Sequence, residues 1–227
     1  MPFQDLPDRL AEATEQIKRA GERGGRGQAV TIVAVTKTFG ADAPVAAWQA
    51  GVRDVGENRV QEAAAKMAEV AVPLRWHLIG HLQRNKVKQL DAFHLIHSMD
   101  SGRLADAMAQ HGSGRGRPVD VLLQVNVSGE GTKGGYGLAD IECEAERLRG
   151  MDGLAVHGVM TMAPFDADEA TLRAVFRGAR SARDTLRAAG HPATELSMGM
   201  SGDYEVAVEE GATLVRLGTV LFGARSA

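Results

Sequence analysis

Residues 52–79, VRDVGENRVQEAAAKMAEVAVPLRWHLI, contain the unit from which the fold is built. The stretch opens with a strand-like run at residues 52–56 and closes with a second run at residues 75–79. Between them, apolar residues recur three or four positions apart, as on one face of an α-helix: Val60, Ala64, Met67 and Ala71. Strand, helix and strand in this order predict a βαβ unit with two parallel strands.

The same alternation continues along the chain. Strand-like runs occur at residues 31–36, 52–56, 75–79, 94–99, 119–127, 154–160, 194–197 and 213–217, with helical patterns between them. This order predicts an α/β fold, either a (β/α)8 TIM-type barrel or an open doubly wound sheet. The first strand-to-helix turn, residues 37–40, lacks the glycine pattern of dinucleotide-binding sheets, so the barrel is favoured.

A helical pattern also precedes the first strand. It places four apolar residues on one face: Leu6, Leu10, Ala13 and Ile17. Because the sequence stops only a few residues after the eighth run, we expect this extra N-terminal helix to cover the wall that a long final helix would otherwise cover. The expectation is one barrel domain over residues 1–227.

Composition limits the classes of partner. The chain has 26 basic and 29 acidic residues and a net charge of −3, so it offers no basic surface for nucleic acid or an anionic membrane. Its single cysteine excludes an intramolecular disulfide framework. No targeting segment opens the sequence, and no apolar run reaches the roughly 20 residues that span a bilayer. We expect a soluble, cytoplasmic monomer.

In an α/β barrel, reactive groups sit at the carboxyl ends of the strands. The first run leads into Lys37, which shares strand parity with Val33 and Val35 and would therefore face the interior with them. Partial desolvation there favours the neutral amine that attacks an aldehyde. The alternative is a lysine that extends from the strand end into solvent.

Two turns after the seventh and eighth runs suit a phosphate group. Ser201 lies in a small-residue turn before a helical segment at residues 204–210, where it could bind phosphate or simply cap the helix. Gly218 and Thr219 form a second such turn, on the adjacent strand. Arg216 has the parity that turns it inward beside them, and we expect a ligand to receive its charge.

Several motifs together carry a family resemblance: AVTK at residues 34–37, GENRVQE at 56–62, WHLIGHLQRNK at 76–86, SMGMS at 197–201 and VRLGT at 215–219. Over nearly the whole chain, the sequence resembles the pyridoxal-phosphate homeostasis protein family. That family is similar to the N-terminal barrel domain of alanine racemase. The resemblance implies the cofactor pyridoxal 5′-phosphate (PLP), held as a Schiff base on Lys37.

The resemblance also implies further roles. Arg216 would face the pyridine nitrogen, Asn58 would lie near the ring, and Ser201 with Gly218 and Thr219 would hold the phosphate. Lys133, in the glycine-rich loop after the fifth run, matches a lysine beside the cofactor and could guide PLP during release. No catalytic residue is implied.

Three features favour a carrier or buffer of PLP over an amino-acid racemase. A guanidinium at residue 216 is donor-only and disfavours protonation of the ring nitrogen, so the ring becomes a weaker electron sink. Met162 stands where the racemase motif carries a ring-stacking histidine, and the sequence ends where a racemase continues into a second domain. Apo PLP enzymes are the candidate recipients. A third interpretation is a barrel enzyme in which Lys37 forms a Schiff base with a phosphorylated substrate, as in aldolases.

His77 and His81 have the i, i+4 spacing of a helical metal pair, but they straddle Gly80 at a strand end. We therefore expect no metal site there, and core or supporting roles for both histidines.

Overall fold

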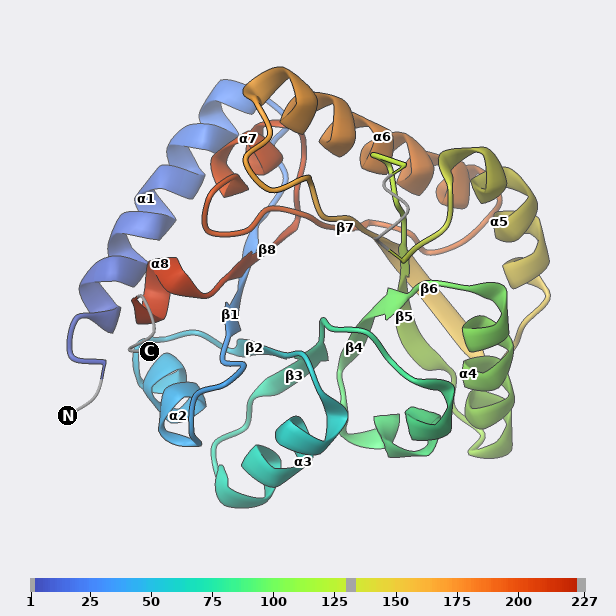
Figure 1. The fold of residues 1–227 in the computed structure, drawn as a ribbon, viewed down its shortest axis with the longest axis horizontal. Coiled ribbons are helices and arrows are strands. Elements are labelled where there is room, and N and C mark those ends of the chain that lie inside the picture. Colours follow the sequence, from blue (N-terminus) through green and yellow to red (C-terminus); the bar gives the residue numbers. More distant parts are fainter. Residues whose placement is uncertain (1–2, 130–133, 224–227) are drawn as a thin grey trace.

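A computed structural model describes residues 3–129 and 134–223. Eight parallel strands form a closed barrel in sequence order, and β1 pairs with both β2 and β8 to complete it (Figure 1). The strands are β1 (Thr31–Val35), β2 (Asp54–Glu57), β3 (Arg75–Leu78), β4 (Leu95–Met99), β5 (Val119–Gln124), β6 (Leu154–Met160), β7 (Glu195–Ser197) and β8 (Leu214–Leu217). The predicted TIM-type barrel is confirmed, and the open sheet is excluded.

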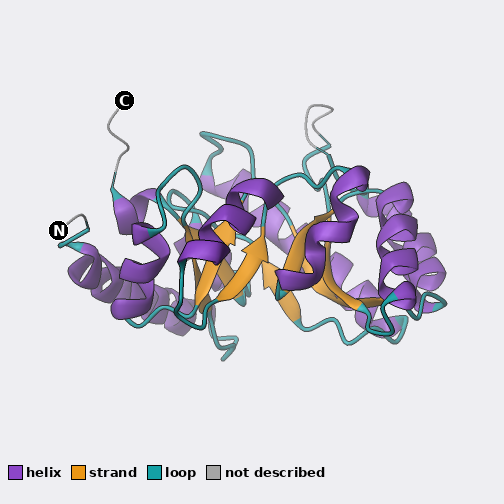
Figure 2. Cartoon of the chain, turned by 90° about the horizontal axis from the view of Figure 1, so that it is seen from below, coloured by secondary structure: helices purple, strands orange, loops and turns teal. Residues whose placement is uncertain are grey.

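Helices surround the barrel on its outside (Figures 1 and 2). They are α1 (Leu6–Gly24), α2 (Asp42–Gln49), α3 (Val60–Glu69), α4 (Gly102–Gly114), α5 (Ile141–Arg149), α6 (Glu169–Ala188), α7 (Tyr204–Glu209) and α8 (Thr219–Phe222), with 3₁₀ helices η1 (Arg84–Ala92) and η2 (Leu138–Asp140). The connection between β3 and β4 is thus a 3₁₀ helix rather than the expected α-helix. Within the described ranges, every helix is too short or too polar to cross a bilayer.

The period-2 alternation of the strands divides the apolar side chains between two clusters. A small cluster takes one residue from each of five strands and fills the barrel interior: Val33, Leu95, Leu122, Met160 and Leu214. The larger cluster includes residues of the covering helices, such as Phe176 and Leu186 of α6. Val33 on β1 therefore points inward, and so does Leu214 on β8, which fixes the parity of the residues that follow them.

The N-terminal helix lies along the outer wall beside α7 and α8 (Figure 1). Its predicted apolar face is buried at Leu6, Ala13 and Ile17, while Leu10 is partly buried against the core. Because α8 spans only Thr219–Phe222, α1 supplies most of the cover at this position, as expected from the sequence.

Candidate functional site

A cavity of about 1140 Å³ opens at the carboxyl end of the barrel. All six residues proposed from the sequence for cofactor binding line it: Lys37, Asn58, Ser201, Arg216, Gly218 and Thr219. They come from the ends of β1, β2 and β8 and from the loop after β7, so closure of the barrel brings together residues up to 182 positions apart in the sequence (219 minus 37).

Lys37 is half-buried at the cavity wall, two residues beyond Val35, which also lines the cavity. The inward parity predicted from the sequence is correct. The next residue, Thr38, has a φ of 69°, a left-handed conformation that costs energy in a non-glycine residue. Its backbone N–H donates to Glu62 Oε1 at 2.5 Å, which holds the turn that follows Lys37.

A buried ion pair supports this turn from behind. Lys66 Nζ donates to the Thr36 carbonyl and to Glu57 Oε1, each at 2.7 Å, and Thr36 Oγ1 donates to the same carboxylate oxygen at 2.6 Å. Burial raises the pKa of Glu57, although the hydrogen bonds from Lys66 and Thr36 oppose the rise. Sequence reasoning missed Lys66. Its spacing of four residues from Glu62 on a predicted helix indicated an ion pair with Glu62, but only the fold shows that Lys66 also pairs with the buried Glu57.

The turn containing Ser201 packs against α7 and is hydrogen-bonded to α8. Gly199 has a φ of 94°, and a Cβ there would lie 2.8 Å from Ala207 Cβ, so this position requires glycine. Val220 N–H donates to Ser201 Oγ at 3.3 Å, which joins this turn to the one containing Gly218 and Thr219.

Ser201 does not cap α7. The N-cap is Asp203, which makes no side-chain cap bond and instead accepts a hydrogen bond from Met200 N–H at 2.6 Å. Because Ser201 Oγ accepts from Val220, its hydroxyl hydrogen can still be donated to a ligand. The structure therefore counts against the capping interpretation and is compatible with phosphate binding.

Arg216 is 4% exposed and forms part of the cavity wall. Burial lowers its pKa to about 10, so the guanidinium remains charged at neutral pH. We expected a ligand to receive this group, and the structure shows that two protein oxygens already accept hydrogen bonds from it. Nη1 donates to Ser197 Oγ at 2.6 Å and Nη2 to the Thr161 carbonyl at 2.9 Å. Both acceptors are neutral, and the arginine is thereby held in one orientation.

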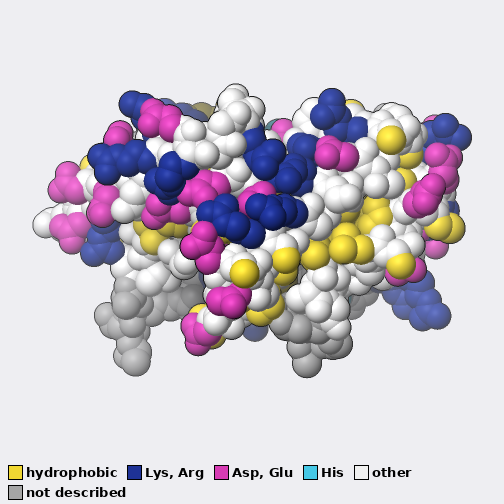
Figure 3. Space-filling model, turned by 90° about the horizontal axis from the view of Figure 1, so that it is seen from above, with side chains coloured by type: hydrophobic (Ala, Val, Ile, Leu, Met, Phe, Trp, Pro, Cys, Tyr) yellow, Lys and Arg dark blue, Asp and Glu magenta, His cyan; other side chains and the backbone are white. Residues whose placement is uncertain are grey.

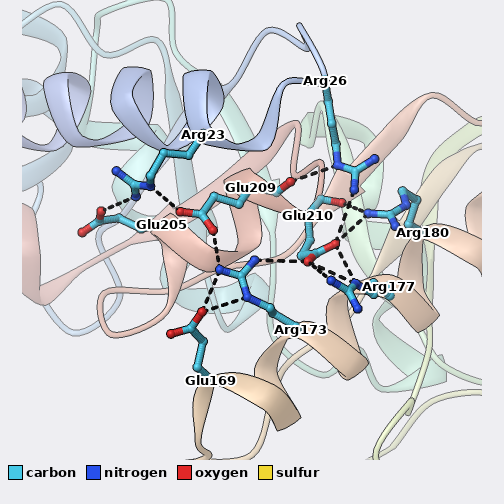
Figure 4. Close-up of polar contacts among 9 residues, drawn as sticks. All are labelled: Arg23, Arg26, Glu169, Arg173, Arg177, Arg180, Glu205, Glu209 and Glu210. Atoms are coloured by element: carbon cyan, nitrogen blue, oxygen red, sulfur yellow. Dashed lines mark hydrogen bonds and ion pairs between the residues drawn. The ribbon is translucent and has the colours of Figure 1, made fainter.

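A network of ion pairs fixes α7 behind the Ser201 turn. Its carboxylates are Glu169, Glu205, Glu209 and Glu210, and its arginines are Arg23 and Arg26 from α1 and the following segment, and Arg173, Arg177 and Arg180 from α6 (Figure 4). On this face of the molecule, basic and acidic side chains lie next to one another (Figure 3). Sequence reasoning did not identify the network. The i, i+4, i+7 spacing of the three α6 arginines was the available signal.

The two histidines that have metal-pair spacing lie apart. His77 is buried and bonded to Asp54 and His97, each at 2.9 Å, whereas His81 is exposed at the cavity and contacts Asp100 at 3.0 Å. No group of metal-ligating side chains occurs in the part of the chain that the structure describes. Lys133 lies outside the described residues.

The loop after β6 also lines the cavity, and sequence reasoning had drawn only Met162 from this region. It contributes residues 163–167, including Phe165, whose side chain is 93% exposed. Gly80 approaches the other wall closely, since a Cβ there would lie 2.4 Å from the Asn58 carbonyl oxygen. A side chain at residue 80 would displace Asn58.

Comparisons with known proteins match this geometry over nearly the whole chain. The family model "Alanine racemase, N-terminal domain" matches residues 8–226. The pyridoxal phosphate homeostasis protein of Aquifex aeolicus is 40% identical over 222 residues, which cover 96% of this chain and 97% of the relative.

Solved structures give the same result. PipY of Synechococcus elongatus, in a structure with PLP bound, is 38% identical with a TM-score of 0.85 and covers 96% of this chain and 100% of its own. Alanine racemase of Corynebacterium glutamicum, at 17% identity and a TM-score of 0.74, covers 96% of this chain but 61% of its own, and shows the shared fold alone. The chain therefore belongs to the alanine racemase N-terminal domain family and, within it, to the pyridoxal phosphate homeostasis proteins.

Proposed function

We propose that this protein binds PLP in the barrel cavity, as a Schiff base on Lys37, and acts as a carrier or buffer in intracellular PLP homeostasis. The observation that carries the proposal is the placement of Lys37, the buried Arg216 and the linked Ser201 and Gly218 turns around one cavity. The names of the relatives and the PLP-bound structure of PipY support it.

The donor groups of the cavity fit the three functional groups of PLP. A lysine amine suits the aldehyde, hydroxyl and glycine turns suit the phosphate, and a donor-only guanidinium suits an unprotonated pyridine nitrogen. The cavity, at about 1140 Å³, is slightly larger than typical small-molecule sites of about 300 to 1,000 Å³. When bound, the cofactor would supply a reactive carbonyl and an electron-withdrawing ring.

The charge of Arg216 favours a carrier over a racemase. A buried guanidinium with a pKa of about 10 keeps its protons at neutral pH and disfavours a second positive charge on the ring nitrogen. Carbanion chemistry needs that ring as an electron sink, so it would lack a major source of stabilisation here. We further propose that the protein is a cytoplasmic monomer, that apo PLP enzymes are the recipients, and that Lys133 assists release.

The test is the absorption spectrum of the protein mixed with PLP, followed by borohydride reduction and peptide mass spectrometry. We expect a yellow product and a reduced adduct on Lys37, lost in Lys37→Ala and retained in Lys88→Ala, which removes an exposed lysine of η1. An adduct mainly on Lys133 would contradict the Lys37 assignment. Absence of the yellow product would instead favour the aldolase-like interpretation. Reactivation of an apo PLP enzyme by the loaded protein would support the carrier role.

A further inference from the structure

A continuous row of hydrogen-bonded side chains crosses the barrel interior below the cavity. Asp54 Oδ1 lies 2.9 Å from His77 Nε2, His77 Nδ1 lies 2.9 Å from His97 Nε2, and His97 Nδ1 lies 2.8 Å from Ser197 Oγ. Arg216 Nη1 completes the row at 2.6 Å from the same hydroxyl. Strands β2, β3, β4, β7 and β8 contribute one residue each, and none is more than 4% exposed.

With both imidazoles neutral, the network allows one assignment of protons. The Asp54 carboxylate only accepts, so His77 Nε2 carries a hydrogen and His77 Nδ1 does not. His97 Nε2 must then donate to His77, which leaves His97 Nδ1 as an acceptor. Arg216 only donates, so Ser197 Oγ accepts from it and donates its own hydrogen to His97. Every donor points away from Arg216 and toward Asp54.

A carboxylate stands at one end of this row and a guanidinium at the other. Complete burial lowers the pKa of His97 well below its ordinary value, and the positive charge of Arg216 adds to the effect, so His97 is neutral. Burial by itself would raise the pKa of Asp54, but the hydrogen bonds from His77 and Arg75 outweigh it and keep the pKa below its usual range. The Asp54 carboxylate is also paired with Arg75, whose Nη2 lies 2.5 Å from Oδ2, and two imidazoles and a hydroxyl link this carboxylate to the Arg216 guanidinium.

We propose that Ser197, His97, His77 and Asp54 are positioning residues that fix the orientation of Arg216. The row and the Thr161 carbonyl take one donor each from Nη1 and Nη2, which leaves other guanidinium donors for the cavity. This inference rests on the proposed PLP site. The row would thereby keep the ring nitrogen of bound PLP as an unprotonated acceptor.

The first test needs no cofactor. In the protein labelled with ¹⁵N-histidine, we expect both His77 and His97 to show a protonated Nε2 and an unprotonated Nδ1. A protonated Nδ1 on either residue would overturn the assignment. This readout is independent of whether PLP binds, so it stands or falls separately from the proposed function.

The second test uses Ser197→Ala, which removes the hydroxyl that is hydrogen-bonded to both His97 and Arg216. We expect PLP affinity to fall about tenfold and the ¹⁵N shift of ring-labelled PLP to move, because the guanidinium is no longer held. Ser197→Thr should restore both. Ser98→Ala is the matched control, since Ser98 is equally buried on β4 but donates to the Gly80 carbonyl outside the row.

If Ser197→Ala does not fold, Asp54→Asn takes its place, because it removes the negative charge at the end of the row opposite Arg216 without altering the cavity wall. The inference fails if the folded variant keeps the affinity and ring shift of the unmutated protein. If the unmutated protein does not bind PLP at all, the proposed function fails while the tautomer result remains.

Discussion

Replacing Glu210 with glutamine tests whether the ion-pair network behind the Ser201 turn stabilises the fold. The Glu210 side chain is 3% exposed and lies within 3.5 Å of arginines from three helical positions on α6 and of Arg26. Burial by itself would raise its pKa, but the hydrogen bonds from Arg177, Arg180 and Arg173 lower it to about 2, from an ordinary value of 4.5.

The size of the effect follows from this pKa difference. A fall from 4.5 to about 2 corresponds to about 3 kcal/mol of unfolding free energy at neutral pH. The arginines are partly exposed, so solvent screening reduces the expected loss in Glu210→Gln to about 2 kcal/mol. Because the folded pKa lies below the unfolded one, the stabilisation is fully present above about pH 4.5 and is lost as the pH falls toward 2.

Urea unfolding of both proteins at pH 7 and at pH 3 measures this difference. We expect the free energy of unfolding of Glu210→Gln to lie about 2 kcal/mol below that of the unmutated protein at pH 7, and this difference to be smaller at pH 3. Glu142→Gln, which replaces an exposed carboxylate of α5, is the control and should leave the free energy of unfolding unchanged at both pH values. A gap under about 0.5 kcal/mol at pH 7 would refute the reasoning, since that is the range of ordinary surface substitutions. A gap of equal size at both pH values would show that lost packing, rather than charge, is responsible.

Three further predictions concern the cavity. Lys37→Ala should abolish the borohydride-fixed PLP adduct while leaving the thermal unfolding midpoint within a few degrees, because an apolar side chain fits the upper barrel; loss of the fold would contradict this. Ser201→Ala should lower the affinity for PLP about ten- to a hundredfold, because one charge-assisted hydrogen bond contributes roughly 1.5 to 3 kcal/mol. The affinity for unphosphorylated pyridoxal should stay nearly unchanged, and equal losses for both ligands would place the phosphate elsewhere. The PLP-loaded protein should turn over L-alanine negligibly in deuterated water, because Arg216 disfavours ring protonation, and racemisation or transamination at about 1 s⁻¹ or faster would support the racemase alternative.

The sequence by itself determined the order of strands and helices, favoured the barrel over an open sheet, and predicted the inward direction of the two main cavity residues. Apolar periods of about 3.6 and 2 residues are local properties, so eight strands with helices between them could be read directly. Parity then placed Lys37 with Val33, and Arg216 with Leu214, on the interior face, as the structure shows. Binding of PLP by these residues stays a prediction.

The surroundings of those residues depended on the tertiary structure. His97 and Ser197 are 100 positions apart and meet only because the closed barrel faces β4 toward β7. The sequence pattern places Lys66 on the surface of a helix, whereas in the structure its amine is buried and donates to the Thr36 carbonyl. Local patterns record which face a side chain occupies, whereas its partner across the barrel is fixed by strand order and register, which no short stretch of sequence contains.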